Sequence, residues 1–155
     1  MRCAAILALC VVLASAGAAS ADRRKLVVVV AKGSSITSIS TSDLKHCFMG
    51  DSTSVDGKPV VPFNAEPKTA ERAGFDRGVL GMSPDEVGRY WVDRKVRGQS
   101  SAPRSLPSVM HVQKVVAKFP NAISYLPADQ LTPDVQAVKL DGIAYTDGSY
   151  ALFTD

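Results

Sequence analysis

The first long apolar run outside the N-terminal segment is LVVVVA, residues 26–31. It is continuous and rich in β-branched side chains, with no polar residue at alternate positions. Such a run is typical of a strand that is buried on both faces, as in a sheet with helices on either side. The sequence therefore predicts a central strand here, followed by a Ser/Thr-rich loop over residues 33–40.

Three later segments predict further extended structure. They are residues 59–63 (PVVPF), 122–126 (AISYL) and 135–140 (VQAVKL). The two prolines limit the first segment to an edge or terminal position, because proline cannot donate a ladder hydrogen bond. The tail, residues 143–153, contains Asp147-Gly148, a favoured pair for a tight turn, and therefore predicts a hairpin.

Four segments show the hydrophobic spacing of an amphipathic helix. The third has the strongest signal, because Ser83 and Glu86 form a capping box around Pro84. The second has the weakest signal, because Gly74 and Gly78 each cost about 1 kcal/mol relative to alanine. The first segment begins at Thr41 or Ser42 and ends before Gly50, and the second spans residues 69–80. The third runs from Ser83 to Gly98, and the fourth spans residues 108–119.

Strands and helices therefore alternate, with several helices in succession in the middle of the chain. The segment QSSAPRSLP, residues 99–107, reads as a loop between the last two helices. The pattern predicts an α/β fold with a mixed sheet flanked by helices.

The N-terminal segment predicts export. Residues 1–21 contain a single positive charge, a short apolar stretch and small residues before Ala21, the pattern of a secretory signal peptide. The alternative, a short membrane anchor, is disfavoured because a bilayer span needs about 20 apolar residues. Cleavage would leave residues 22–155 as one domain in the periplasm or outside the cell, with no membrane span after signal removal.

Charge and cysteine content exclude some functions. The formal net charge of +3 is too small to indicate nucleic-acid binding. Cys3 and Cys10 lie in the predicted signal peptide, so Cys47 has no partner for an internal disulfide. With only His46 and His111 in the chain, we expect no histidine-rich metal site and no cofactor.

Five segments occur in a fixed order along the chain. They are DLKHCFMGD, DGKPVVPFN, ERAGFDRGVLGMSPDEVGRYW, RGQSSAP and VVAKFPNAISYLP. In order and spacing they resemble the periplasmic phosphate ABC-transporter substrate-binding family, over nearly all of residues 26–142. Complete members of that family are longer and close two lobes around the ligand. The resemblance therefore implies one lobe of a type II periplasmic binding protein, with an ABC permease or another envelope protein as partner.

The resemblance also implies a binding turn. In the family, phosphate lies against a helix start that carries serine, glycine and threonine, and this slot falls here on Thr69-Ala70-Glu71. The first N–H groups of a helix lack intrahelical partners and lie at the positive end of its dipole. Lys68 and Arg72 flank the turn and would offset the carboxylate of Glu71. Two serines of the loop after the first strand, Ser34 and Ser35, are candidates to approach the same end of the sheet.

Two interpretations of this turn stay open. In the first, Thr69, Lys68 and Arg72 help to bind phosphate or another small oxyanion. In the second, Thr69 only caps a helix, and the domain is an extracytoplasmic protein-interaction module that kept the fold and lost the ligand. Catalysis is not expected: Cys47 and His46 are adjacent on a helix and point about 100° apart, so they do not face each other as nucleophile and base.

Overall fold

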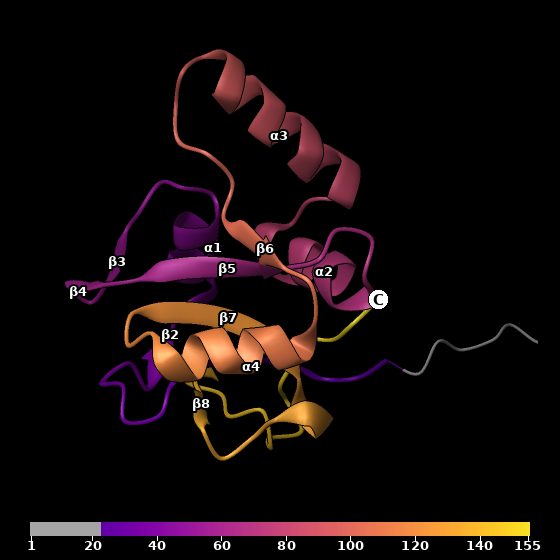
Figure 1. Ribbon diagram of the computed structural model, residues 1–155. Coiled ribbons are helices and arrows are strands. Elements are labelled where there is room, and N and C mark those ends of the chain that lie inside the picture. Colours follow the sequence, from indigo (N-terminus) through magenta and orange to yellow (C-terminus); the bar gives the residue numbers. More distant parts are fainter. Residues whose placement is uncertain (1–22) are drawn as a thin grey trace, which may run out of the picture.

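The computed structural model describes residues 23–155. The predicted signal peptide, residues 1–21, lies outside the described residues. A five-stranded mixed sheet with the strand order β6-β5-β7-β1-β8 forms the centre of the molecule (Figure 1). Its strands are β1 (Leu26–Ala31), β5 (Val61–Ala65), β6 (Arg104–Leu106), β7 (Ala122–Pro127) and β8 (Val135–Ala137).

The strand directions decide which loops meet. β5 runs parallel to both of its neighbours, β6 and β7. β1 runs antiparallel to β7 and to β8, with Leu26 opposite Pro127. The carboxyl ends of β5, β6 and β7 therefore lie along one edge of the sheet, and β1 ends at the opposite edge. The predicted α/β fold with a mixed sheet is confirmed.

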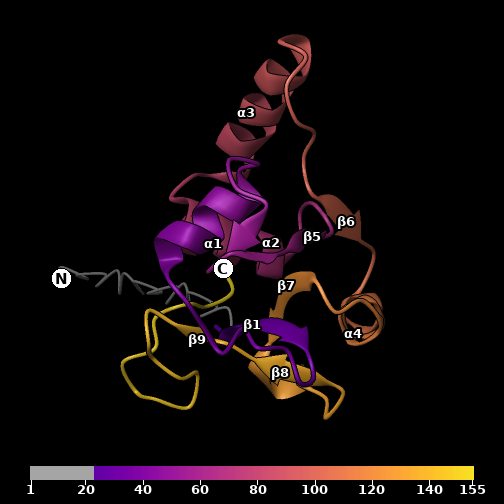
Figure 2. The same cartoon turned by 90° about the vertical axis from the view of Figure 1, so that its left-hand side faces the viewer.

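Helices cover both faces of this sheet (Figure 2). The helices are α1 (Thr41–Phe48), α2 (Ala70–Phe75), which continues as the π-helical turn η1 (Asp76–Leu80), α3 (Pro84–Val96), α4 (Val109–Lys118) and the 3-10 turn η2 (Ala128–Gln130). Alternate residues of β1 face opposite layers: Val28 packs in the cluster with α1, α2 and η1, and Val29 packs in the cluster with α4. All six residues of β1 are buried, as the continuous apolar run predicts.

Two small sheets complete the body. β2 (Ser38–Ile39) pairs with β9 (Lys139–Leu140), and β3 (Ser54–Val55) pairs with β4 (Lys58–Pro59). Three aromatic side chains fill the core beneath α1 and α2. Phe75 stacks on Tyr125 with ring centroids 3.9 Å apart, and Phe48 lies 4.6 Å from Phe75.

The chain after residue 143 does not form the predicted hairpin. It runs back past β1 instead, where Leu26 donates its backbone N–H to Leu152 and Thr154 donates to Arg24. This segment crosses α2 at Gly74, where an added Cβ would overlap the carbonyl oxygen of Phe153. The glycine that weakens the helix signal is therefore required for tertiary contact.

Three smaller predictions are also corrected. The helix cap before α1 is Ser40, whose hydroxyl accepts from the backbone N–H of Asp43, and neither Thr41 nor Ser42 takes this role. The predicted strand over residues 135–140 is divided into β8 and β9, which belong to different sheets. The segment predicted as a loop before α4 contains β6, because its backbone finds a partner in β5.

α3 projects from the body of the molecule (Figure 1). Its capping box is present as predicted, with Ser83 and Glu86 bonded to each other's backbone. Contacts with the loop after α1 hold its body-facing side. Tyr90 donates its hydroxyl to Met49 O at 2.9 Å, and Arg94 pairs with Asp51 at 3.0 Å.

Candidate functional site

A small cavity lies at the carboxyl edge of β5 and β6, where α2 and α4 both begin. Its volume is about 120 Å³. Half of the residues that line it are apolar, and the polar ones are Glu66, Thr69, Glu71, Ser108 and Tyr125. Open α/β sheets bind ligands beyond the carboxyl ends of their strands. This cavity is therefore the candidate site that the sheet topology indicates.

Thr69 forms the start of α2. Its hydroxyl accepts from the backbone N–H of Arg72 at 3.2 Å and donates to the carbonyl of Glu66 at 2.8 Å. Lys68 precedes it with a φ of +70°, a left-handed conformation that turns the chain into the helix. The predicted helix start is therefore confirmed, with Thr69 as its cap.

Ser108 forms the start of α4. Its hydroxyl accepts from the backbone N–H of His111 at 3.4 Å and lies 2.8 Å from Nδ1 of the same residue. Because Thr69 and Ser108 line one cavity, the positive ends of two helix dipoles face the same small volume. The caps already take the N–H groups of Arg72 and His111, so the donors that each start can supply are the N–H groups of its first two helical residues.

Ion pairs occupy the charged groups around α2. Arg24 donates to the Glu71 carboxylate at 2.6 Å, so the acidic group in the binding turn is neutralised. Arg72 donates to both carboxylate oxygens of Asp76 at 2.9 Å. Burial raises the pKa of Asp76, although the neighbouring Arg72 acts in the opposite direction. The structure thus directs Arg72 into the protein, toward a side chain that is 1% exposed, and away from the cavity.

The other predicted site residues are not brought to this cavity. Lys68 is exposed and does not line it. Ser34 and Ser35 follow β1 and lie at the opposite edge of the sheet, where their carbonyls accept from Gln136 and Lys58. The expectation that these serines approach the binding turn is wrong, because β1 runs antiparallel to β7 and hence opposite to β5.

Two residues at the site were not identified from the sequence. The sequence pattern presents Ser108 only as a helix start, and the strand β6 that precedes it lies in a segment that the pattern presents as a loop. Arg24 has no local signal, because its partner Glu71 is distant in sequence. A serine at a helix start is the available signal for Ser108, since any helix start is a potential anion site.

The remaining candidates for chemistry lie elsewhere. Cys47 is buried in α1, and this burial raises the pKa of its thiol. The imidazole of His46 lies 3.8 Å from Asp51. Within residues 23–155, no group of three His, Cys, Asp or Glu side chains is placed to hold a metal ion. The same part of the chain contains no helix with the length and apolarity to cross a membrane.

Comparison with solved structures finds a similar fold in phosphate-transport receptors. A Clostridium perfringens structure, described as a phosphate ABC transporter substrate-binding protein with bound phosphate, superposes with a TM-score of 0.68 at 17% identity, covering 85% of this chain and 53% of its own. An ABC-type phosphate transport receptor of Vibrio cholerae gives 0.67 at 15% identity, covering 85% and 54%. PstS of Borrelia burgdorferi gives 0.62 at 10% identity, covering 86% and 55%.

These similarities concern the fold. No protein-family model matches the chain, and no curated protein matches its sequence. The chain spans about half the length of the solved structures that it matches. The resemblance to phosphate ABC-transporter substrate-binding proteins that the sequence motifs indicate is therefore confirmed at the level of the fold.

Proposed function

We propose that this chain is an exported, non-enzymatic binding domain that holds a small oxyanion such as phosphate in the cavity between α2 and α4. The observation that carries the proposal is the convergence of two helix starts on one cavity at the carboxyl edge of the sheet. Helix starts favour anions because their N–H groups are free and their dipoles are positive there. The fold of phosphate-transport receptors supports the same ligand class.

The dimensions and charges of the cavity favour a small ligand bound weakly. A volume of about 120 Å³ is well below the roughly 300–1,000 Å³ typical of pockets for larger organic ligands. Arg24 neutralises Glu71, but Glu66 remains at the rim and opposes an incoming anion. The described residues supply one wall of a cleft, so water reaches the anion and screens its charge.

In this proposal the anion is bound by backbone N–H groups of the first turns, and the hydroxyls of Thr69 and Ser108 fix those turns as caps. An ABC permease or another envelope protein would receive the loaded domain, as the likeness to transport receptors supports. The predicted export to the periplasm or beyond is part of the same proposal. Neither Lys68 nor Arg72 is needed for it.

Calorimetric titration with phosphate and with sulfate tests this function. We expect Thr69→Ala and Ser108→Ala each to weaken binding about fivefold, because each change removes the cap that fixes a first helical turn, and a cap is worth about 1 kcal/mol. Glu71→Gln is expected to strengthen binding, since it removes a negative charge that lines the cavity. Ser35→Ala, at the opposite edge of the sheet, is the matched control and should bind like the wild type.

One observation favours a second function, a protein-interaction module without a ligand. The pairs Arg24–Glu71 and Arg72–Asp76 satisfy the charges of the binding turn within the protein itself. A titration without heat for either anion, together with no response in Glu71→Gln, would favour this alternative. Unchanged affinity in both Thr69→Ala and Ser108→Ala would place any anion elsewhere and overturn the proposed site.

A further inference from the structure

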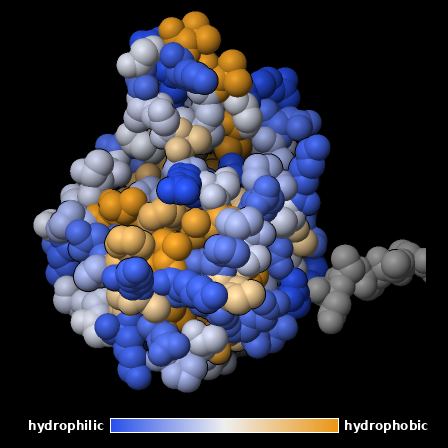
Figure 3. Space-filling model, viewed as in Figure 1, coloured by the Kyte–Doolittle hydropathy of each residue, from blue (hydrophilic) through white to orange (hydrophobic). Residues whose placement is uncertain are grey.

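The outer face of α3 is an exposed apolar surface. Val92 and Val96 are 65% and 82% exposed, although both belong to a regular 13-residue helix. Figure 3 shows hydrophobic surface on the projection that this helix forms. A shallow groove follows the same side of the helix from Pro84 to Val96.

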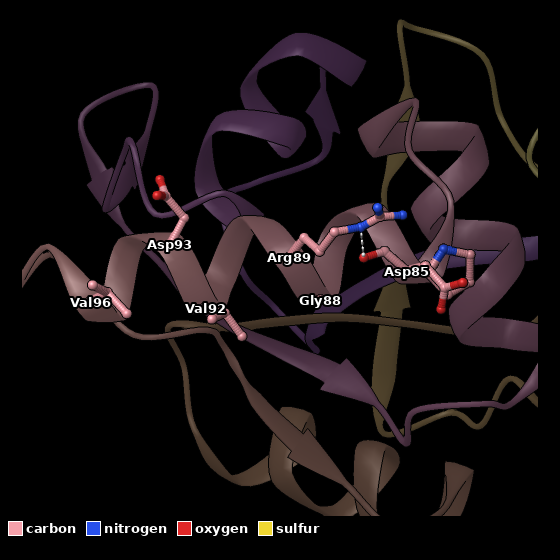
Figure 4. Close-up of a pocket in the computed structure, with 7 residues that line it drawn as sticks. Asp85, Gly88, Arg89, Val92, Asp93 and Val96 are labelled. Atoms are coloured by element: carbon pink, nitrogen blue, oxygen red, sulfur yellow. Dashed lines mark hydrogen bonds between the residues drawn. The ribbon is translucent and has the colours of Figure 1, made fainter.

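Gly88, Val92 and Val96 form a stripe at intervals of four residues along this face. Figure 4 shows Val92 and Val96 on the same edge of α3 and Asp93 on another. The body-facing side of the helix is different and carries Val87 and Tyr90. Nothing lies within 4 Å of the position that a Cβ would take at Gly88, so the middle of the outer face is open to a close approach.

Charged residues run beside this stripe with alternating sign. Asp85, Arg89, Asp93 and Arg97 are spaced four residues apart, and Figure 4 shows the first three together with the hydrogen bond from Arg89 to the carbonyl of Asp85. Arg97 donates to Asp93 at 3.0 Å within the helix, but both side chains are more than half exposed. Exposed pairs at this spacing contribute only about 0.3–0.5 kcal/mol, so they are easily exchanged for other partners.

We propose that α3 is the contact surface of a homodimer in which the helices of two copies pack antiparallel about a two-fold axis near residue 91. In that register, Arg89 of one copy faces Asp93 of the other, and Asp85 faces Arg97. The two-fold axis repeats both pairs, so four oppositely charged pairs form across the contact. Val96 of one copy lies over the stripe next to Gly88 of the other, where the absence of a side chain leaves room.

The order of charges along α3 favours a second copy of this chain as the partner that binds its outer face. An alternating series of an even number of charges is complementary to itself when reversed, which is the condition for an isologous antiparallel contact. In a parallel pair the charged rows of the two helices would lie on opposite flanks of the contact and would not meet. A helix of 13 residues is about 20 Å long, so the contact area is small and the dimer is weak and concentration-dependent.

Sedimentation equilibrium of the purified protein over a range of concentrations tests the dimer. We expect a reversible monomer–dimer equilibrium in the wild type and a monomer at all concentrations in Val92→Glu/Val96→Glu. Both sites are exposed, so circular dichroism should show an unchanged fold. Phe119→Lys, which removes an exposed apolar side chain on another surface, is the matched control and should dimerise normally. A monomeric wild type, or loss of the dimer in Phe119→Lys alone, would overturn the proposal.

Cysteine cross-linking tests the register. Across an axis near residue 91, two copies of residue 92 are offset by only about 3 Å along the helix, and two copies of residue 96 by about 15 Å. Disulfides require Cα atoms less than about 7 Å apart. We therefore expect Val92→Cys to form a disulfide dimer readily and Val96→Cys, the more exposed site, to form it at least about tenfold more slowly. The reverse order would exclude this arrangement even if a dimer exists.

Discussion

The two consecutive helical segments α2–η1 and α3 are stabilised in opposite ways. α2–η1 contains two glycines and a π-helical turn, yet it carries the buried side chains of Phe75, Val79 and Leu80. α3 has a complete capping box and a regular length, yet Val87 is its only fully buried residue. The segment α2–η1 therefore has poor local helix signals and strong tertiary packing, whereas α3 has good local helix signals and weak tertiary packing.

This difference shows that a buried helix and an exposed helix gain their stability from different interactions. A short helix gains most of its stability from the packing of one face, so poor intrinsic propensity is tolerated when that face is buried. A projecting helix has less packing to rely on, and its caps and propensities matter more. The difference also separates the two proposed sites, because the anion cavity uses the buried region and the dimer surface uses the exposed one.

The largest expected effect comes from breaking the buried ion pair of α2–η1. Asp76→Ala leaves the guanidinium of Arg72, whose side chain is 12% exposed, without its partner. We expect a loss of about 3–5 kcal/mol in the free energy of unfolding, the usual cost of orphaning a buried charge. Asp93→Ala removes the equivalent acid of an exposed pair in α3 and should cost about 0.3–0.5 kcal/mol.

Urea denaturation of both variants, at a concentration where the protein is monomeric, measures this contrast. The double variant Arg72→Met/Asp76→Leu distinguishes the orphaned charge from lost packing. It should recover most of the lost stability, because replacing a whole buried pair by apolar residues is often neutral. Equal losses in Asp76→Ala and Asp93→Ala would contradict the comparison between the two helices.

A glycine exchange is expected to have the next largest effect, with opposite sign in the two helices. In Gly74→Ala, the new Cβ would lie 2.7 Å from Cα of Thr154, so the C-terminal segment must shift, at a cost of about 1–3 kcal/mol. In Gly88→Ala the Cβ meets nothing within 4 Å, and the variant should be more stable by about 1 kcal/mol. Thermal unfolding of the two variants at low protein concentration measures both changes in stability. A stabilised Gly74→Ala would refute the packing argument.

The smallest expected effect concerns the cap of α3. Ser83→Ala removes one half of the capping box, which is worth about 1 kcal/mol. Because α3 projects from the body, this loss should appear as local opening. We expect hydrogen exchange to accelerate about fivefold at amides of α3 and to stay unchanged at amides of β1, as read by NMR. Equal acceleration in both elements would show that α3 unfolds only together with the sheet.

Part of the candidate site could be predicted from the sequence. The helix start at Thr69 follows from a local pattern, since a capping hydroxyl bonds to a backbone group three residues away. The sequence could not show that Ser108 lines the cavity or that Arg72 pairs with Asp76 and is directed away from it. Each depends on the direction in which a side chain or a neighbouring helix points. Ser34 was placed at the wrong edge because strand direction within a sheet is not a local property.

By itself, the sequence determined the local elements of this protein: the buried strand β1, the capped helix α3, and the alternation that indicates an α/β fold. These elements depend on hydrogen bonds and hydrophobic periodicity within a few residues, and such local interactions are encoded in each segment by itself. Only the tertiary structure decided that β6 is a strand, that the tail crosses Gly74, and that two helix starts share one cavity. Each of these joins segments far apart in sequence, and such contacts form only when the folded sheet brings their backbones together.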